Sequence, residues 1–365
     1  MKKVGTYILR IILLVNIAVI VLLLIAAYSS YLSPSRFPVL SCFGLAYMVF
    51  FAVNIVFLLF WVFARPLYAL ASLAGIIFTF GALRQSFPVN FGGGDEGRSL
   101  KVLSYNVMGL CLQKPHKDDD RNAVLDYIAA SGADIVCMQE YILSTNQHFL
   151  NEDDVLRALE MYPYHATVQL NYSGNPNQLA CFSKYPIIGS QRIDYDSANN
   201  GSAIFTLSVD GDTVVVINNH LESNKLTAAD KAAYASLVDS PSAERIKENF
   251  FSLVGKLADA AAIRAEQARA VRAVMDEHLH QPLIVCGDFN DGPLSYAHRV
   301  LNDGMQDAFT RRGRGLGISY NENKFFFRID NILVNDEWEV VSCKVDDTIE
   351  DSDHYPIIAE LRLAD

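Results

Sequence analysis

The sequence predicts an all-α region with membrane-spanning character at the N-terminus, followed by an α/β domain built in layers. The charge distribution separates the two. Residues 1–84 contain six basic and no acidic residues, whereas the remainder contains 24 basic and 41 acidic residues and carries a formal charge of −17. Beyond residue 99, strand-like apolar runs are mixed with helical patterns, which indicates layers rather than a pure crossover barrel. We place the two regions at 1–84 and 99–365, joined by a flexible linker at 85–98.

Three apolar stretches in the first region predict membrane-spanning helices. Such a helix needs about 20 apolar residues, or about 17 at the shortest. Stretches 11–27 and 42–63 satisfy this and 67–83 is at the limit, so we expect helices at about 11–32, 39–63 and 66–83. A cleaved signal peptide, with a basic start at Lys2 and Lys3, is the alternative for the first stretch. A re-entrant or interfacial segment is the alternative for the third. Membrane lipid is the expected partner of this region, and no protein partner is inferred.

The basic residues beside the apolar stretches indicate the orientation. Lys2, Lys3 and Arg10 precede the first stretch and Arg65 separates the second from the third, whereas only Arg36 lies in the other loop. With three spans and a cytoplasmic N-terminus, the acidic domain lies on the extracytoplasmic side; with two spans, it lies in the cytoplasm. The five cysteines of the domain show no disulfide or zinc spacing, which is weak evidence against an oxidising compartment. We expect the extracytoplasmic placement.

Ten strands are expected in the second region. Each is a short run of apolar, β-branched or aromatic residues, and turn-forming residues separate many of the runs. Asp210, Gly211 and Asp212 lie between two such runs and predict a β-hairpin. The expected strands are Leu100–Val107, Asp134–Gln139, Tyr164–Leu170, Leu179–Ser183, Ala203–Val209, Thr213–His220, Leu283–Cys286, Ile329–Val334, Glu339–Val345 and Pro356–Leu363.

Helices are expected between some of these strands, at 119–131, at 153–160 and in a long alanine-rich region at 228–280. In the last region, Pro241 predicts a break. Four apolar residues then recur at helical spacing: Ile246, Phe250, Leu253 and Leu257. Two interpretations of this region stay open. It is either a helix that packs one face on the domain, or a lid that faces the substrate near His220 and the membrane.

Six segments far apart in the chain join a buried apolar run to carboxylate, amide or imidazole groups. They read LSYNV, DIVCMQE, VVVINNH, GDFND, RIDNILV and SDHYP. Such groups are costly to bury unless a metal ion or hydrogen bonds satisfy them. We therefore expect them to converge on one site of oxygen ligands with two histidines. That composition is typical of Mg²⁺-assisted phosphate chemistry.

The alternation of side chains along a strand places Asn218 and His220 on one face, and we expect both to bind substrate. After the turn at Gly287, Asp288 and Asn290 share a face in the same way. There the carboxylate can orient a water molecule, and the amide can bind a phosphate or the attacking oxygen. An Asx-rich turn without chemistry is the alternative for these two residues.

Asp353 and His354 are adjacent, so we expect them to have separate partners. Asp353 suits a metal ion. His354 needs a carboxylate that fixes its tautomer and raises its basicity, and Asp330 is the candidate. Mg²⁺ accepts few protein ligands and keeps several waters, so Asn106 and Glu140 together with Asp353 would suffice to hold it.

The six motifs, in this order, resemble the endonuclease/exonuclease/phosphatase superfamily, whose members include pancreatic deoxyribonuclease, apurinic endonucleases, neutral sphingomyelinases and inositol polyphosphate phosphatases. The resemblance covers about residues 99–363 and is specific to the superfamily, but not to a substrate. It implies a four-layer α/β sandwich, with two β-sheets inside and helices outside. It also implies an Mg²⁺ or Mn²⁺ ion at the mouth of the site.

The resemblance further implies a role for each matching residue. Glu140 resembles the principal metal ligand, with Asn106 and Asp353 nearby. Asp288 and Asn290 resemble the pair that orients water and binds phosphate.

Two histidines complete the implied site. His220 resembles the histidine that contacts the scissile phosphate, and His354 with Asp330 resembles the family's His–Asp pair. The general base differs among members, so we assign it jointly to His354–Asp330 and Asp288. Water then attacks in line, while the metal and the imidazoles stabilise the extra charge.

One loop departs from the family pattern. Where members often have a small residue, Gln178 and Leu179 stand here. The preceding SGNPNQ loop is where some members place a carboxylate that supports the first catalytic histidine, and this chain has Asn175 and Asn177 but no acid there. His220 therefore lacks a charged partner, or takes one from Glu222 or another loop.

The substrate is expected to be a phosphoester: a lipid head group, a nucleotide or a nucleic acid. A charge of −17 argues against a long duplex footprint, because nonspecific nucleic-acid binding relies on lysine and arginine. Arg311, Arg312 and Arg314 form either a local phosphate-binding patch or a solvated loop. The alternatives to a membrane-anchored phosphoester hydrolase are a surface or periplasmic nuclease and a non-catalytic module that binds a phosphorylated ligand.

Overall fold

The computed structural model of this protein describes residues 2–91, 97, 99–111, 122–144, 150–171, 176–239, 243–322 and 325–364. Some of the sequence predictions fall outside these ranges. They are part of the linker at 85–98, the start of the helix expected at 119, Asn175, the break at Pro241, and the side chains of Ile246 and Phe250.

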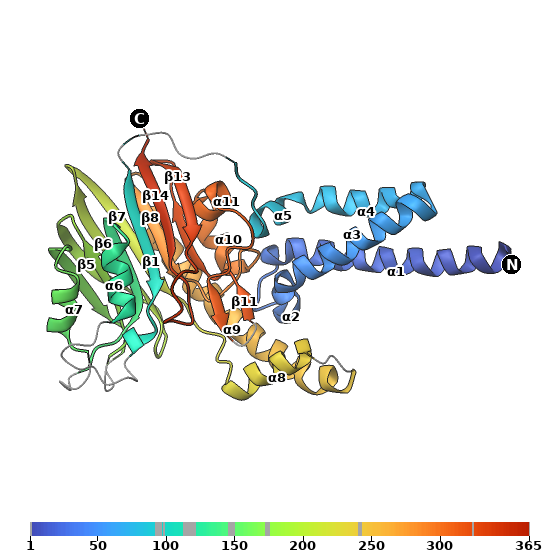
Figure 1. The fold of residues 1–365 in the computed structure, drawn as a ribbon, viewed down its shortest axis with the longest axis horizontal. Coiled ribbons are helices and arrows are strands. Elements are labelled where there is room, and N and C mark those ends of the chain that lie inside the picture. The colour runs from blue at the N-terminus through green and yellow to red at the C-terminus, as the bar shows by residue number, and fades with distance from the viewer. Residues whose placement is uncertain are drawn as a thin grey trace.

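Two six-stranded β-sheets form the centre of the second region (Figure 1). In spatial order, the first sheet contains β13 (Trp338–Val345), β14 (Ile357–Leu363), β1 (Leu100–Asn106), β2 (Ile135–Tyr141), β4 (Gln178–Ser183) and β3 (Tyr164–Gln169). The second contains β5 (Ile187–Ile193), β6 (Gly201–Val209), β7 (Asp212–His220), β8 (Leu283–Asp288), β12 (Asp330–Val334) and β9 (Gln306–Asp307). A separate two-stranded ribbon consists of β10 (Tyr320–Glu322) and β11 (Phe325–Phe327).

The two sheets pack face to face through a shared apolar core. Val102 and Cys137 contribute from the first sheet, and Val216 and Cys286 from the second, all fully buried. Strand alternation sends the intervening residues to the outer face of each sheet. The buried cysteines are unpaired and serve as small apolar residues, as the sequence predicts.

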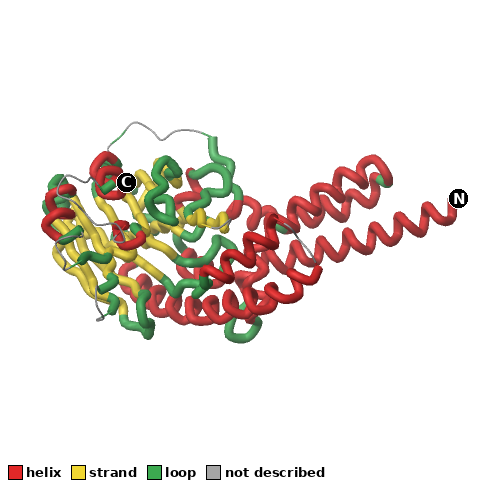
Figure 2. Tube along the Cα trace, turned by 60° about the horizontal axis from the view of Figure 1, so that its bottom comes forward, coloured by secondary structure: helices red, strands yellow, loops and turns green. Residues whose placement is uncertain are grey.

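Helices cover the outer faces. On the first sheet, α6 (Ala123–Ala130) and α7 (Glu152–Ala158) pack over the strands. On the second sheet, α9 (Ala243–His278) and α10 (Tyr296–Asn302) do the same, and Val271 and Met275 of α9 are fully buried there. The order is helix, sheet, sheet, helix, so the predicted four-layer α/β sandwich is confirmed. A second view shows helices on the flanks of the strands (Figure 2).

Several elements have no counterpart among the expected ones, among them the short strands β9, β10 and β11. Strand β5 lies at a sheet edge and four consecutive residues of it are exposed, so its sequence carries no apolar pattern. Helices α10 and α11 (Ala308–Arg312) have seven and five residues, too few to show a helical period. The alanine-rich region forms two helices, α8 (Ala228–Asp239) and α9.

The strand registers bring the polar strand ends together. Strands β1 and β2 are parallel, with Asn106 opposite Gln139, and β7 and β8 are parallel, with His220 opposite Asp288. Strand β12 runs antiparallel to β8 and places Asp330 opposite Asp288 on the other side. Parallel neighbours end at the same sheet edge, so the polar ends of four strands are gathered without any long loop.

The N-terminal region forms helices that project from one end of the domain (Figure 1). Among the described residues, two helical segments are long and apolar enough to cross a membrane, Thr6–Tyr31 and Pro38–Ala64. They contain α1 (Lys2–Tyr28) and α3 (Tyr47–Ala64), with the short helix α2 (Pro38–Ser41) before α3. A third span results only if α4 (Pro66–Phe78) and α5 (Phe80–Ser86), which meet at 57°, count as one.

A polar cluster inside these helices explains the one polar residue that interrupts the first apolar stretch. The Oδ1 atom of Asn16 accepts hydrogen bonds from Trp61 Nε1 at 2.9 Å and Ser72 Oγ at 3.1 Å. Asn54 Nδ2 donates to the backbone oxygen of Ser72 at 3.0 Å. Asn16 and Asn54 are fully buried. Hydrogen bonds of this kind between apolar helices fix their relative rotation, so α1, α3 and α4 form one bundle.

Gly287 provides a test of the strand geometry at the site. Its φ is +125°, and a Cβ atom would lie 2.0 Å from the backbone oxygen of Asn219. We expect Gly287→Ala to lower the free energy of unfolding by at least about 3 kcal/mol, because both the backbone angle and the contact forbid a side chain. Tryptophan fluorescence of the detergent-solubilised full chain during urea unfolding measures this.

Gly211→Ala is the matched control. Gly211 also has a positive φ, +106°, but has open space around its Cβ position. We expect that variant to lose only about 1 kcal/mol. Equal losses in the two variants would show that the contact with Asn219 does not constrain the structure.

Candidate functional site

The site lies where the two sheets meet at the polar strand ends. Asn106 ends β1 in the first sheet and Asp288 ends β8 in the second. Asn106 Nδ2 donates a hydrogen bond to Asp288 Oδ2 at 3.1 Å and lies 3.3 Å from Glu140 Oε1. The Oδ1 atom of Asn106 accepts from the backbone N–H of Met108 at 3.1 Å. Both Asn106 and Asp288 are about 1% exposed, so this contact joins the sheets in a buried environment.

A β-bulge directs Glu140 toward this contact. Strand β2 pairs with β4 up to Met138 opposite Ala180 and again at Tyr141 opposite Gln178, so β2 contains one extra residue. Glu140 has a φ of +52°, which is unfavourable for a residue with a side chain. Bulges of this kind turn a side chain out of the strand pattern. The Glu140 side chain is one-third exposed, in contrast to its buried neighbours.

Asp288 is the most heavily contacted carboxylate of the site. Its Oδ1 accepts from the backbone N–H of Asn290 at 2.8 Å, and its Oδ2 accepts from Asn290 Nδ2 at 3.2 Å. Burial raises the pKa of Asp288, and the nearby His354 and His220 offset part of that effect. Asn290, with a φ of +52°, also donates to the backbone oxygen of Leu221 at 2.9 Å. The turn after β8 therefore holds the carboxylate in one orientation.

His354 and Asp330 form a buried pair. His354 Nδ1 lies 2.8 Å from Asp330 Oδ2, and the Nε2 atom of the same ring lies 3.6 Å from Asp288 Oδ2. Burial lowers the pKa of His354, but the carboxylates of Asp330 and Asp288 outweigh it and raise the value to about 10. The ring packs edge-on against Tyr320, with centroids 5.0 Å apart. The pairing predicted for His354 is thus present in the geometry.

His220 faces the same carboxylates from the second sheet. Its Nε2 lies 3.6 Å from Glu140 Oε1 and 3.7 Å from Asp288 Oδ2, beyond normal hydrogen-bond length. Its Nδ1 is buried and has no hydrogen-bond partner among the described residues. Glu222 does not supply one, because its carboxylate accepts from Ser197 Oγ at 2.9 Å and lies 2.7 Å from Lys225 Nζ.

Asn218 does not join the other predicted site residues. Its Nδ2 donates to the backbone oxygens of Met138 at 3.0 Å and Ala180 at 3.3 Å, and its Oδ1 accepts from Gln139 Nε2 at 2.6 Å. All of these partners belong to the first sheet, and Asn218 is fully buried. The predicted face is correct, since Asn218 and His220 both point toward the first sheet. The amide, however, is occupied by contacts that hold the sheets together.

The donor set expected for a metal ion fits a hard divalent cation. Glu140 presents a carboxylate oxygen at the end of β2, and Asp353 lies near enough for the charge of Glu140 to affect it. Asn106 supplies an amide at the adjacent strand end, with its Nδ2 toward Glu140 and its Oδ1 on the backbone N–H of Met108. Burial raises the pKa of Asp353, and the charge of Glu140 adds to that effect while His354 opposes it. Oxygen ligands of this type are the ones that Mg²⁺ and Mn²⁺ prefer.

A second group of ligand atoms lies close together within the described residues. Asp288, Asp330 and His354 have ligand atoms within 4.8 Å of one another. His354 Nδ1 and Asp330 Oδ2 are already joined at 2.8 Å, so neither atom is available to a cation without breaking that bond. Asp330 Oδ1 and His354 Nε2 are not part of that bond, so this group stays beside the ligands predicted from the sequence, Asn106, Glu140 and Asp353.

Sequence reasoning missed one wall of the site. Lys231 of α8 donates to Tyr320 Oη at 2.8 Å and forms an ion pair with Glu322, so α8 is fastened to the β10–β11 ribbon beside His354. Tyr234 stacks on Phe325 of the same ribbon, with centroids 4.0 Å apart. Strands β10 and β11 have three residues each and give no period to read. The alanine-rich region was expected to be either a packing helix or a lid, and each description fits one part of it. Helix α8 lies beside the site, and the C-terminal half of α9 packs on the second sheet.

Comparison with known proteins gives two family matches. The model of the endonuclease/exonuclease/phosphatase family matches residues 103–354. A second family model, of a domain of unknown function, matches residues 9–86. No curated protein is similar enough to match the sequence.

Three solved structures illustrate the likeness in fold. An endonuclease/exonuclease/phosphatase from Beutenbergia cavernae DSM 12333 has a TM-score of 0.53 and 19% identity, over 73% of this chain and 72% of that chain. The human nocturnin catalytic domain, with a bound sulfate anion, has a TM-score of 0.51 and 17% identity, over 73% and 95%. A family protein from Bacteroides thetaiotaomicron has a TM-score of 0.50 and 18% identity, over 72% and 95%.

Asn218→Ala tests whether this amide holds the sheets or binds substrate. We expect the variant to lose about 1–3 kcal/mol of stability, because two backbone oxygens and Gln139 lose their buried partner. The kcat/KM of the remaining folded protein should stay within about threefold of the native value, a difference under 1 kcal/mol. Thermal melting and steady-state kinetics measure the two effects. A normal melting temperature combined with a raised KM would instead place Asn218 in the substrate site.

Proposed function

This chain belongs to the endonuclease/exonuclease/phosphatase family, and we propose that it is a membrane-anchored hydrolase of phosphate esters that uses Mg²⁺ or Mn²⁺. The observation that carries the proposal is the buried group in which Asp288 faces the Nε2 atoms of His354 and His220 at 3.6 and 3.7 Å. These distances are too long for a direct hydrogen bond. Both Nε2 atoms can therefore contact oxygen atoms of a substrate or of water.

The metal ligands lie beside that group. Asn106, Glu140 and Asp353 are the residues that hold the ion, and Asn106 also contacts Asp288. When bound, the ion neutralises charge on the phosphate oxygens as a Lewis acid. Glu140 keeps an unfavourable backbone angle that aims it out of its strand, and such strain is typical of functional positions.

Side chains of the domain carry out the remaining steps of the proposed reaction. Asp288 and Asn290, held by the turn after β8, orient the attacking water and bind the phosphate. His220 donates to a phosphoryl oxygen. Asp330 holds His354 in the tautomer with a proton on Nδ1, so that Nε2 faces the reaction centre. We assign the general base jointly to Asp288 and the His354–Asp330 pair. Because the carboxylates raise the pKa of His354 to about 10, its ring is protonated at neutral pH, and Asp288 is the member of this group that can accept the proton from water.

The N-terminal region anchors this domain in a membrane. We assign 1–84 to the anchor, 85–98 to a linker and 99–365 to the catalytic domain. Two apolar helical segments of 26 and 27 residues support the anchor. The match of a separate family model to 9–86 supports the boundary. The positions of Lys2, Lys3 and Arg10 support an extracytoplasmic catalytic domain, with the bent pair α4–α5 as the third span.

The substrate class that fits best is the head-group phosphoester of a membrane lipid. The anchor keeps the domain at a membrane, and the acidic domain disfavours long nucleic acids. The arginine-rich segment does not offset this. Arg312 Nε donates to the backbone oxygen of Val340 at 2.7 Å, and Arg314 donates to that of Asn90 at 2.9 Å.

Two other functions remain as outcomes of the test. A surface or periplasmic nuclease would use the same chemistry on nucleic acid. A non-catalytic module would bind a phosphorylated ligand without turnover, but it would not need the complete set of histidines and carboxylates seen here.

Glu140→Gln tests the metal-dependent reaction. We expect the full chain, reconstituted in lipid nanodiscs with Mg²⁺, to release product from at least one of sphingomyelin, phosphoinositides, single- or double-stranded DNA and bis-p-nitrophenyl phosphate. EDTA should abolish turnover, and Glu140→Gln should lower kcat/KM by about 10²-fold or more, because a charged ligand is lost. The exposed Glu339→Gln is the control and should leave turnover unchanged.

The outcomes separate the candidate functions. Cleavage of a lipid supports the proposal, and cleavage of DNA alone identifies a nuclease. Binding of a phosphorylated ligand by a folded chain that cleaves nothing identifies the non-catalytic module. Native turnover in Glu140→Gln would falsify the assignment of the metal site.

Asp330→Asn tests the His–Asp pair separately. The amide keeps the size of the side chain but removes the charge that holds His354, which lies 2.8 Å away. We expect kcat to fall by about 10²–10⁴-fold with KM nearly unchanged. Asp336→Asn, at an exposed position, is the control. If kcat stays within a few-fold of native while circular dichroism confirms the fold, the pair has no part in the reaction.

A further inference from the structure

The domain is docked on its membrane helices by specific contacts rather than tethered loosely. Leu294 of the domain is buried in an apolar cluster with Leu23 and Ala26 of α1. Ser29 Oγ donates to the backbone oxygen of Leu294 at 3.3 Å. Arg328 Nη2 donates to the backbone oxygen of Gln85 at 2.7 Å. These contacts come from both ends of the helical region, so they fix the position of the domain relative to the helices.

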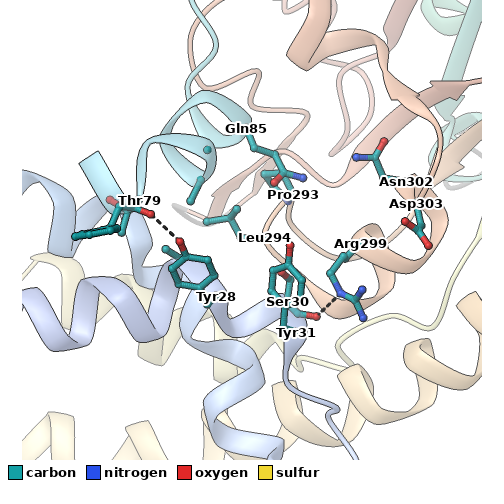
Figure 3. A pocket seen from close by; sticks show the side chains of 14 residues that line it. Tyr28, Ser30, Tyr31, Thr79, Gln85, Pro293, Leu294, Arg299, Asn302 and Asp303 are labelled. Carbon is teal, nitrogen blue, oxygen red and sulfur yellow. Dashed lines mark hydrogen bonds between the residues drawn. The ribbon is translucent and has the colours of Figure 1, made fainter. Parts of the chain in front are cut away.

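Beside these contacts lies a cavity of about 420 Å³ between the two parts (Figure 3). The helical side contributes Tyr28, Tyr31 and Phe78, and the domain contributes Leu294, Arg299 and Asp303. The volume is within the range of about 300–1,000 Å³ that small-ligand sites occupy. The cavity does not include any residue assigned to the phosphoester site, so it is a second site.

Arg299 is held in place on the wall of this cavity. Its Nε donates to the backbone oxygen of Ser30 at 2.9 Å, as Figure 3 shows. Its guanidinium carbon lies 4.9 Å from the ring centroid of Tyr31 and 5.2 Å from that of Tyr296. Among the described residues, the terminal nitrogens of Arg299 donate no hydrogen bond. A guanidinium fixed by two rings and one bond loses little freedom when it binds a phosphate.

The cavity has one positive and one negative side chain. Asp303 lines it together with Arg299, and Figure 3 shows both on the domain side. The charges of the lining residues cancel. Asp303 would repel a ligand that carries only an anionic phosphate. A head group with both a phosphate and an ammonium group can instead place the phosphate at Arg299 and the ammonium at Asp303.

The position along the helices identifies the source of such a group. Tyr28 and Tyr31 follow directly after the apolar part of α1, and aromatic rings of this kind lie at the level of lipid head groups. Resting on the membrane anchoring proposed above, we propose that the cavity binds the head group of a zwitterionic phospholipid, phosphatidylethanolamine. Arg299 binds its phosphate and Asp303 its ammonium group. The bound lipid contacts both parts of the protein and stabilises their docking.

The test measures which lipid the full-length protein retains. The chain is reconstituted in nanodiscs that contain equimolar phosphatidylethanolamine and phosphatidylglycerol, released into mild detergent, and examined by native mass spectrometry. We expect phosphatidylethanolamine to be retained over phosphatidylglycerol by about tenfold, which corresponds to 1.4 kcal/mol. Arg299→Gln should lose this retention. Arg36→Gln, at an exposed arginine in the same connection after α1 that does not line the cavity, should not.

Asp303→Asn keeps the proposal testable if Arg299→Gln fails to fold. Asp303 is exposed, so its replacement does not disturb the docking contacts. We expect this variant to retain less phosphatidylethanolamine and more phosphatidylglycerol. An unchanged lipid ratio in Asp303→Asn, equal loss in Arg299→Gln and Arg36→Gln, or retention of neither lipid by the native chain overturns the proposal.

The hydrolysis assays report on the other site. A chain that retains phosphatidylethanolamine but cleaves no phosphoester supports this inference and contradicts the proposed function. A chain that cleaves a phosphoester but retains no lipid does the reverse. A chain that stays soluble without detergent contradicts the membrane anchoring on which this inference rests.

Discussion

The hydrogen bond from Asn106 to Asp288 joins the two sheets at the edge where both carry charged groups. Apart from this edge and the hydrogen bonds that Asn218 makes to the first sheet, the sheets meet through apolar side chains, such as Val102 and Val216. At this edge, carboxylates and imidazoles occupy the same low-dielectric interior. Hydrogen bonds from Asn106 and Asn290 to Asp288, and the His354–Asp330 pair, offset most of the cost of burying them, whereas His220 Nδ1 has no partner among the described residues. The positions of these side chains depend on those contacts.

Backbone geometry supplies the precision that the hydrogen bonds alone do not. Gly287 and Asn290 both have positive φ values, and they bracket Asp288 in the chain. Glu140 reaches the site through a bulge and a positive φ of its own. Each of these conformations costs about 1–3 kcal/mol when the residue carries a side chain. The surrounding sheets compensate for that cost, so the strained positions coincide with the polar strand ends.

Because the domain is docked on its helices, its distance and orientation relative to the proposed membrane are fixed. Leu294 and Arg299 contact α1 and the turn after it. The α8 helix is fastened to the β10–β11 ribbon next to His354 through Lys231. In Figure 1, α8 and the start of α9 extend along the same side as the N-terminal helices.

Sequence by itself determined the layered α/β class, the separate apolar region and nearly all the candidate residues, because these depend on local patterns. A buried apolar run that ends in Asp288 or Glu140 is visible in a single segment. Tertiary structure alone decided which groups meet. It placed Asn218 in the contact between the sheets and separated Glu222 from His220, whereas the His354–Asp330 pair was already predicted from the sequence. Those outcomes depend on registers and on one bulge, which shift side chains by whole positions and leave no trace in local composition. The contact of α8 with Tyr320 involves strands too short to show a periodic pattern. The cavity at Arg299 lies between segments far apart in the sequence, so no local pattern indicates it.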